Sequence, residues 1–158
     1  MNNEMDIQAA KKYALDLLSQ REYTQAGLKR KLEQKGADPS VSEQCIADLQ
    51  ALGYVSDERY AELFVRQRAR NGYGPRRIQQ ELQQKGVSSV LVKAALECFD
   101  GDWFENALSV RVKRFPKIAT DLKGSQKQKR FLQYRGFDFS HIDHAMTSYG
   151  AESEDIDY

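Results

Sequence analysis

The chain has 158 residues, of which 41% are hydrophobic and 30% are charged, and its formal net charge is +1. This length suffices for one domain, or for a row of small modules that bury a core. Only three prolines are present, and β-branched runs are few, which favours helices throughout. The sequence shows neither a signal peptide nor a long apolar run, so we expect a cytoplasmic protein without a membrane segment.

Acids and bases are unevenly distributed along the chain. Residues 1–58 hold seven bases and ten acids, whereas residues 111–136 hold nine bases and one acid. Residues 137–158 hold six acids and neither lysine nor arginine. The basic segment therefore predicts a polyanion or an acidic protein surface as the partner.

An internal repeat with a fifty-residue offset organises the sequence. The segment KRKLEQKG at 29–36 matches QQELQQKG at 79–86, and both match KRFLQYRG at 129–136. The similarity extends to both sides of these segments. Each copy is long enough for three helices whose single apolar stripes must be covered by neighbours.

Each repeat is predicted to hold three helices, and the last repeat is followed by an acidic, disordered tail. The repeats cover residues 1–54, 55–101 and 102–150, and the tail covers 151–158. The helices are expected near 7–20, 25–35, 41–52, 57–70, 75–85, 89–99, 103–115, 124–135 and 140–149. The predicted fold is all-α, with three tandem three-helix repeats in an elongated array that can be straight or curved.

Several helix boundaries carry capping signals. Thr24 and Ser56 are suitable N-caps, and Ser40 with Glu43 forms a capping-box pattern. Gly86 is placed to end the fifth helix as a C-terminal cap.

Patterns typical of catalysis or metal binding are scarce. His141 and His144 could share one helix face, but a metal site needs further ligands, so solvated histidines are expected. Cys45 and Cys98 lie on apolar helix faces and are predicted to be buried free thiols. No serine or cysteine has a histidine at a plausible catalytic spacing. We therefore expect neither an enzyme nor a cofactor.

Basic residues of the second and third repeats are the candidate binding residues. Arg76 and Arg77 lie at a helix N-terminus, where the helix dipole disfavours cations, so we expect a partner outside the protein to require them. We also expect their neutralisation to leave stability unchanged. The residues predicted to form the basic face are Arg66, Arg70, Arg76, Arg77, Lys85, Arg111, Lys113, Arg114, Lys123, Lys127, Lys129 and Arg130.

Aromatic residues lie between these bases along the sequence. Tyr73 and Tyr134 could either stack on nucleic-acid bases or join the core. Phe131 and Trp103 are predicted to be core residues. A solvated charged face remains the competing interpretation of the basic residues.

The second repeat resembles that of the RecX regulators, which modulate the bacterial recombinase RecA. Its matching residues are LGY at 52–54, DERYA at 57–61, GPRRI at 74–78, Leu82 and KGV at 85–87. The first repeat adds REYT at 21–24 with KL at 31–32, and the third adds FL at 131–132 with RGF at 135–137. The resemblance covers about residues 8–149.

The resemblance implies a non-enzymatic inhibitor that binds in the groove of the RecA–DNA filament and hinders its growth. It implies suppression of the strand-exchange, ATPase and co-protease activities of RecA, and hence a role in DNA repair and recombination. The implied partners are RecA, as monomer or filament, and single- or double-stranded DNA. We expect the protein to be a monomer.

Two other hypotheses fit the same residues. Three-helix units can act as direct DNA-binding modules. They can also form a helical scaffold that binds an acidic protein without nucleic acid.

Overall fold

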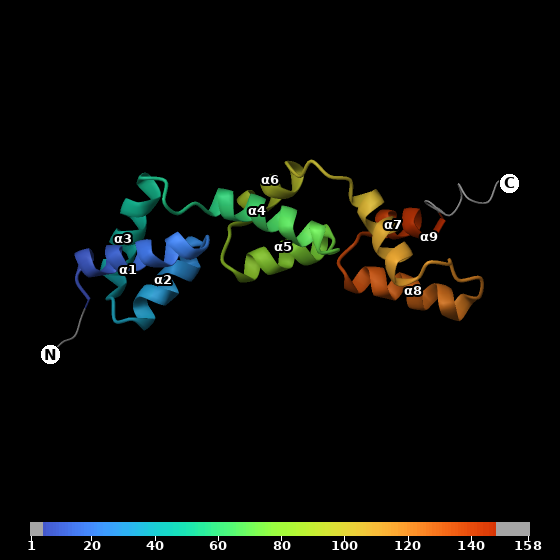
Figure 1. Ribbon diagram of the computed structural model, residues 1–158, viewed down its shortest axis with the longest axis horizontal. Coiled ribbons are helices and arrows are strands. Elements are labelled where there is room, and N and C mark those ends of the chain that lie inside the picture. Colours follow the sequence, from blue (N-terminus) through green and yellow to red (C-terminus); the bar gives the residue numbers. More distant parts are fainter. Residues whose placement is uncertain (1–4, 148–158) are drawn as a thin grey trace. The chain divides into compact units, whose positions relative to one another are not determined.

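The structure is a computed structural model that describes residues 5–147. Within this range the chain forms nine α-helices and no β-strand (Figure 1), which confirms the all-α prediction. The helices are α1 (Ile7–Gln20), α2 (Gln25–Gln34), α3 (Pro39–Ala51), α4 (Asp57–Arg70), α5 (Pro75–Gln84), α6 (Ser89–Glu97), α7 (Trp103–Arg114), α8 (Leu122–Tyr134) and α9 (Phe139–Thr147). The predicted acidic tail lies outside the described residues.

Two helices begin two residues earlier than predicted, and local capping explains both cases. Helix α3 begins at Pro39 after the N-cap residue Asp38, so the predicted capping box at Ser40 is wrong. Proline suits the first helical position because its missing N–H has no partner there. Helix α8 begins at Leu122 because the Asp121 carboxylate accepts the Gly124 N–H at 3.1 Å.

The other predicted caps are confirmed. The Thr24 hydroxyl accepts the Gly27 N–H at 2.9 Å, and the Ser56 hydroxyl accepts the Arg59 N–H at 3.1 Å. Gly86 has φ +89°, the left-handed conformation that ends a helix and that L side chains rarely adopt.

The chain divides into two compact units. Unit 1 comprises Met1–Leu63 and Leu82–Ala95, and unit 2 comprises Phe64–Glu81 and Leu96–Tyr158. The division passes through α4, α5 and α6. Unit 1 therefore contains the first repeat and part of the second, and unit 2 contains the third repeat and the rest of the second.

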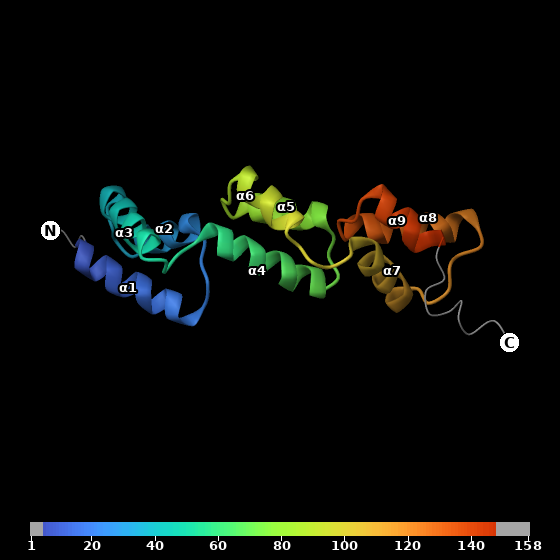
Figure 2. The same ribbon diagram turned by 90° about the horizontal axis from the view of Figure 1, so that it is seen from above.

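Helices α1, α2 and α3 enclose the core of unit 1 (Figure 2). Ala10 and Ala14 of α1 are fully buried, and their small side chains allow close approach of α3. Leu28 and Leu32 of α2 fill the core beside Cys45 of α3. Burial of Cys45 is as predicted, and it raises the pKa of the thiol.

The buried position predicted for Cys98 is wrong. Helix α6 ends at Glu97, so Cys98 follows the helix and is exposed. The apolar pattern of the sequence continues two residues beyond the true end of this helix.

Helices α7, α8 and α9 enclose the core of unit 2 (Figure 1). Ala107 of α7 and Ala145 of α9 are completely buried, which permits the close contact between these two helices. Leu132 of α8 and Phe137 complete the centre. Phe131 and Trp103 pack against this cluster as partly buried residues, in agreement with their predicted core role.

Within residues 5–147, no helix has both the length and the apolar character needed to cross a membrane. The same residues contain no group of three or more His, Cys, Asp or Glu side chains that could hold a metal ion.

Candidate nucleic-acid interface

In unit 2 the start of α5 lies against the end of α8. The Gly74 N–H donates to the Arg135 carbonyl at 2.8 Å, and the Arg76 N–H donates to the Gly136 carbonyl at 2.9 Å. Gly74 is buried, and a Cβ placed on it would lie 2.5 Å from the Gly136 carbonyl carbon. The backbone approach at this junction therefore requires glycine at position 74.

Arginines surround the ring of Tyr73, which lies in the turn between α4 and α5. The guanidinium carbons of Arg68, Arg77 and Arg135 lie 3.9, 4.7 and 4.8 Å from the ring centroid. Arg77 also lies 5.1 Å from the ring centroid of Tyr134, which is 72% exposed. Cation–π contacts of this kind hold the turn and the end of α8 together.

Glu81 compensates two of these arginines. Its carboxylate accepts two hydrogen bonds from Arg68, each 2.9 Å long, and one from Arg77 at 3.2 Å. Burial raises the pKa of Glu81, but the hydrogen bonds from Arg68 and Arg77 outweigh it and lower the pKa below its ordinary value. The carboxylate is therefore ionised and paired at neutral pH.

Arg76 and Arg77 both have partners within the protein. Arg76 bonds to the Asp138 carboxylate at 2.6 Å, and Arg77 bonds to Glu81 and, at 3.4 Å, to the Tyr134 carbonyl. The expectation that neutralisation leaves stability unchanged stays a prediction for Arg76, whose ion pair is exposed, but the partly buried contacts of Arg77 argue against it for that residue. Their partners Asp138 and Tyr134 lie about sixty positions away in the sequence, beyond the reach of local patterns.

Arg111 does not belong to an exposed basic face. Its side chain is completely buried, and it donates hydrogen bonds to the carbonyls of Ala145 at 3.0 Å, Phe115 at 3.0 Å and Pro116 at 3.2 Å. These bonds tie α7 to α9 and to the loop after α7. Burial with carbonyl acceptors makes Arg111 a structural residue.

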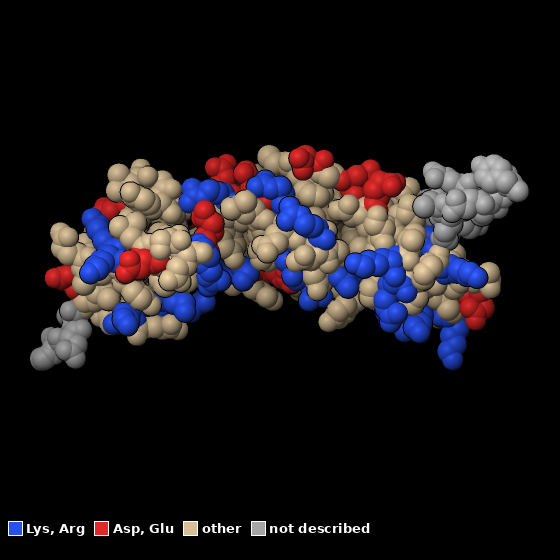
Figure 3. Space-filling model, in the orientation of Figure 1, with Lys and Arg blue, Asp and Glu red and all other residues tan. Residues whose placement is uncertain are grey.

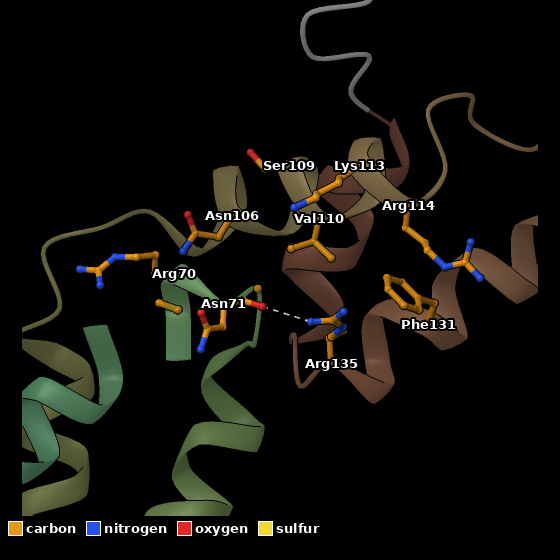
Figure 4. A pocket seen from close by; sticks show the side chains of 11 residues that line it. Arg70, Asn71, Asn106, Ser109, Val110, Lys113, Arg114, Phe131 and Arg135 are labelled. Carbon is orange, nitrogen blue, oxygen red and sulfur yellow. Dashed lines mark hydrogen bonds between the residues drawn. The ribbon is translucent and has the colours of Figure 1, made fainter. Parts of the chain in front are cut away.

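A hollow of about 500 Å³ lies between the end of α4, one side of α7 and the end of α8 (Figure 4). Four basic residues line it: Arg70, Lys113, Arg114 and Arg135. The other lining residues are Ala69, Asn71, Gly72, Asn106, Ser109, Val110 and Phe131, and none of the eleven is acidic. The lining of the hollow therefore combines apolar and basic side chains and contains no acid.

Contacts within this hollow position its cations. Arg135 Nη1 donates to the Asn71 carbonyl at 3.2 Å, the bond drawn in Figure 4. The guanidinium groups of Arg135 and Arg114 lie 5.2 and 5.8 Å from the ring centroid of Phe131. Among the described residues, Arg70 and Lys113 have no ion-pair partner. Their charges are available to an external anion.

The remaining predicted residues lie outside this hollow. Lysines and arginines gather over α8 (Figure 3), where Lys123, Lys127, Lys129 and Arg130 are all exposed. Arg66 is exposed on α4, and Lys85 lies in unit 1. Of the twelve predicted residues, buried Arg111 is thus the one that cannot belong to an exposed basic face.

Sequence reasoning missed Arg135, although a signal for it existed. Arg135 occupies the same position in the third repeat that Lys85 occupies in the second, and Lys85 is among the predicted residues. Asn71, Asn106 and Ser109 gave no signal, because their role depends only on which helices meet around the hollow.

The two histidines have different environments. His141 is buried and its Nδ1 accepts the Asp138 N–H at 3.1 Å, so the predicted solvated position is wrong for this residue. Burial lowers the pKa of His141, although Asp138 and Asp102 act in the opposite direction. His144 is half-buried, and its Nε2 lies 3.3 Å from the Glu105 carboxylate.

Three family descriptions match successive parts of the chain: the first, second and third three-helix domains of RecX at residues 10–49, 56–96 and 100–146. The regulatory protein RecX of Actinobacillus pleuropneumoniae (serotype 5b) is 42% identical over 92% of this chain and 91% of its own. The RecX protein of Pseudomonas fluorescens is 38% identical over 91% and 94%. A crystal structure of RecX from Lactobacillus salivarius shares the fold, with a TM-score of 0.81, 23% identity and coverage of 91% and 96%.

Proposed function

The chain belongs to the RecX family of regulatory proteins, and from this premise we propose that it binds RecA and its DNA filament and inhibits filament growth. Inhibition would reduce the recombinase and co-protease activities that require the filament. The protein would thereby modulate DNA repair and recombination.

The observation that carries this proposal is the occurrence of all three RecX domains in order on one chain. Each domain offers a modest contact surface, and linking several contacts raises the overall affinity through effective concentration. A regulator built in this way needs no reactive group, and the exposed residues among the twelve predicted ones are cations suited to binding.

Basic side chains supply the contacts that the proposal requires. Lys127, Lys129 and Arg130 are exposed on α8, and Arg70 and Lys113 have no ion-pair partner among the described residues. Such cations attract phosphate-rich or acidic surfaces and accelerate association at low ionic strength. A filament of protein on DNA presents both kinds of surface.

Assembly of RecA on single-stranded DNA tests the proposal. We expect added protein to slow filament growth in a dose-dependent manner. The variant Lys127→Gln/Lys129→Gln/Arg130→Gln should inhibit less while keeping the parent's melting temperature. Unchanged filament growth in the presence of saturating wild-type protein would show that the proposed function is wrong.

Direct action on DNA is a second candidate function, favoured by the hollow that contains four bases and no acid. Binding to bare DNA with no effect of the protein on RecA would support this alternative. A steep dependence of affinity on salt would be its signature.

A further inference from the structure

We propose that a phosphate site lies beside each of the two junctions between successive repeats, and that each site binds a backbone phosphate of single-stranded DNA. The inference deepens the proposed function and rests on it, because it assigns the place where the protein contacts DNA. One site is the hollow of unit 2 lined by Arg70, Lys113, Arg114 and Arg135, and the other lies in unit 1.

The same repeat positions meet at both junctions. Thr24 and Gly74 are fifty residues apart, as are Lys85 and Arg135. In unit 1 the Thr24 hydroxyl donates to the Lys85 carbonyl at 3.2 Å. In unit 2 the Gly74 N–H donates to the Arg135 carbonyl at 2.8 Å. Each junction therefore joins the start of the second helix of one repeat to the end of the second helix of the next repeat. The pairs are α2 with α5 in unit 1 and α5 with α8 in unit 2.

Unit 1 has a second basic hollow, of about 280 Å³, beside its junction. Its basic lining residues are Arg21, Arg30, Lys31 and Lys85. Glu22 is the only acid among the residues that line it, and Arg59 binds this carboxylate through two hydrogen bonds of 2.9 and 3.1 Å. The acid is thus neutralised from outside the hollow.

Three further positions correspond between the two linings. Arg21 and Glu22 of unit 1 correspond to Asn71 and Gly72 of unit 2, which also line their hollow. Tyr60 corresponds to Asn106, because Tyr60 directly precedes Ala61 and Asn106 directly precedes Ala107, and these alanines hold the same position in their repeats. The hollows therefore share their place in the repeat, although several of their charges come from different positions.

The charges of both hollows favour a phosphate group. Guanidinium groups bind phosphate through paired hydrogen bonds, and each hollow contains at least two arginines and one lysine. Cations gathered without a free acid repel one another, and a bound anion relieves this repulsion.

Aromatic rings lie beside the cations of both hollows. The Arg21 guanidinium carbon lies 4.3 Å from the ring centroid of Tyr23, which lines the unit 1 hollow. In unit 2 the Phe131 ring lies beside Arg135 and Arg114. Tyr23 is buried and Phe131 packs against the core of unit 2, so these rings position the guanidinium groups and are not themselves surfaces for bases. The proposed function, in which the protein binds a DNA filament, is what selects the DNA backbone as the source of the phosphate.

The test is fluorescence anisotropy of a labelled single-stranded oligonucleotide over a range of salt concentrations. Arg70→Gln/Lys113→Gln changes the unit 2 hollow, and Arg21→Gln/Arg30→Gln changes the unit 1 hollow. Lys12→Gln/Lys93→Gln is the matched control. Both lysines are exposed and lie outside the hollows, and their replacement removes the same total charge as each hollow variant. Circular dichroism checks that every variant is folded.

We expect each hollow variant to reduce the slope of log affinity against log salt by about 0.7 for each phosphate that it no longer neutralises. The combined four-residue variant should show the sum of the two reductions, and the control should keep the parent's slope. Hollow variants that stay folded and match the control would overturn the proposal. Displacement of the oligonucleotide by inorganic phosphate, and not by sulfate at equal ionic strength, would instead assign the hollows to small phosphates and overturn it too.

RecA filament assembly, measured on the same proteins, separates the two proposals. Suppose that wild-type protein slows filament growth, but the hollow variants show the same slope of log affinity against log salt as wild type. The phosphate sites are then wrong and the proposed function stands. If filament growth is unaffected while the hollow variants show the expected smaller slope, the phosphate sites stand and the proposed function is wrong.

Discussion

The Arg77 guanidinium lies close to the rings of Tyr73 and Tyr134 and bonds to the Glu81 carboxylate. Its side chain is 29% exposed and that of Glu81 is 23% exposed. A partly buried pair is screened less than a surface pair, whose contribution to stability is about 0–1 kcal/mol. Arg77 is therefore a structural residue of unit 2 despite its charge.

We predict that Arg77→Gln lowers the free energy of unfolding by about 1–2 kcal/mol, because it removes a charged hydrogen bond and two cation–π contacts. Urea unfolding followed by circular dichroism measures the change. Arg66→Gln is the control, since Arg66 is exposed on α4 and its substitution should stay within about 0.5 kcal/mol. Equal stabilities of the two variants would contradict the structural role of Arg77.

His141 makes the stability of unit 2 dependent on pH. Its buried ring is neutral and accepts the Asp138 N–H, and burial lowers the pKa of the ring below 6.5 in the folded state. The unfolded chain therefore binds a proton more readily than the folded one. This contribution to stability is fully present above about pH 6.5 and is lost as pH falls from there through the folded pKa.

We predict that His141→Asn flattens the pH dependence of the free energy of unfolding below about pH 6.5. An asparagine oxygen can still accept the Asp138 N–H, but the side chain does not titrate. Urea unfolding of parent and variant at neutral and mildly acidic pH provides the comparison. An identical acid-induced loss in both proteins would exclude His141 as its source.

Among the elements, α5 and α8 depend on glycine where they meet. The start of α5 approaches the Gly136 backbone so closely that Gly74 has no room for a methyl group. Gly136 has φ +100° and also lies against the backbone of Arg77. The junction is therefore a contact between two backbones, each with glycine at the point of approach.

We predict that Gly74→Ala destabilises the protein by about 1–3 kcal/mol, the usual cost of overpacking. Gly27→Ala in α2 is a suitable control. The only close neighbour of its new methyl group is the Thr24 hydroxyl, at 3.0 Å, and no other atom lies within 3.4 Å. Alanine also favours a helix by up to about 1 kcal/mol over glycine, which opposes the cost of that contact. Thermal unfolding compares the two variants, and an unchanged melting temperature for Gly74→Ala would mean that the junction can open without cost.

At the scale of the whole molecule, we expect a monomer. The exposed bases of α8 would repel the same surface on a second copy. The most exposed large hydrophobic residues are Leu122 and Tyr134 at opposite ends of α8, Val90 on α6 and Leu52 after α3, and single exposed residues of this kind are normal for a monomer. Sedimentation equilibrium at several concentrations should give one mass of 18.1 kDa, and a mass that rises with concentration would contradict this expectation.

Local patterns were enough to predict the helices, their order and most of their ends to within one residue. Apolar stripes repeat within a few residues, and caps such as Thr24, Ser56 and Gly86 act within one turn of their helix. The repeat was visible because similar residues recur at a fifty-residue offset. The family resemblance followed from the same segments.

The environment of each charge depended on contacts between distant parts of the chain. Arg76 pairs with an aspartate 62 residues away, and Arg111 bonds to a carbonyl 34 residues away in the core. In the sequence both resembled Arg70, which keeps an exposed side chain at the edge of a hollow. Helix periodicity shows on which face of its own helix a side chain lies, but it does not show which residues of other helices pack against that face. Packing between helices is what separates a structural arginine from one that is available to an external anion.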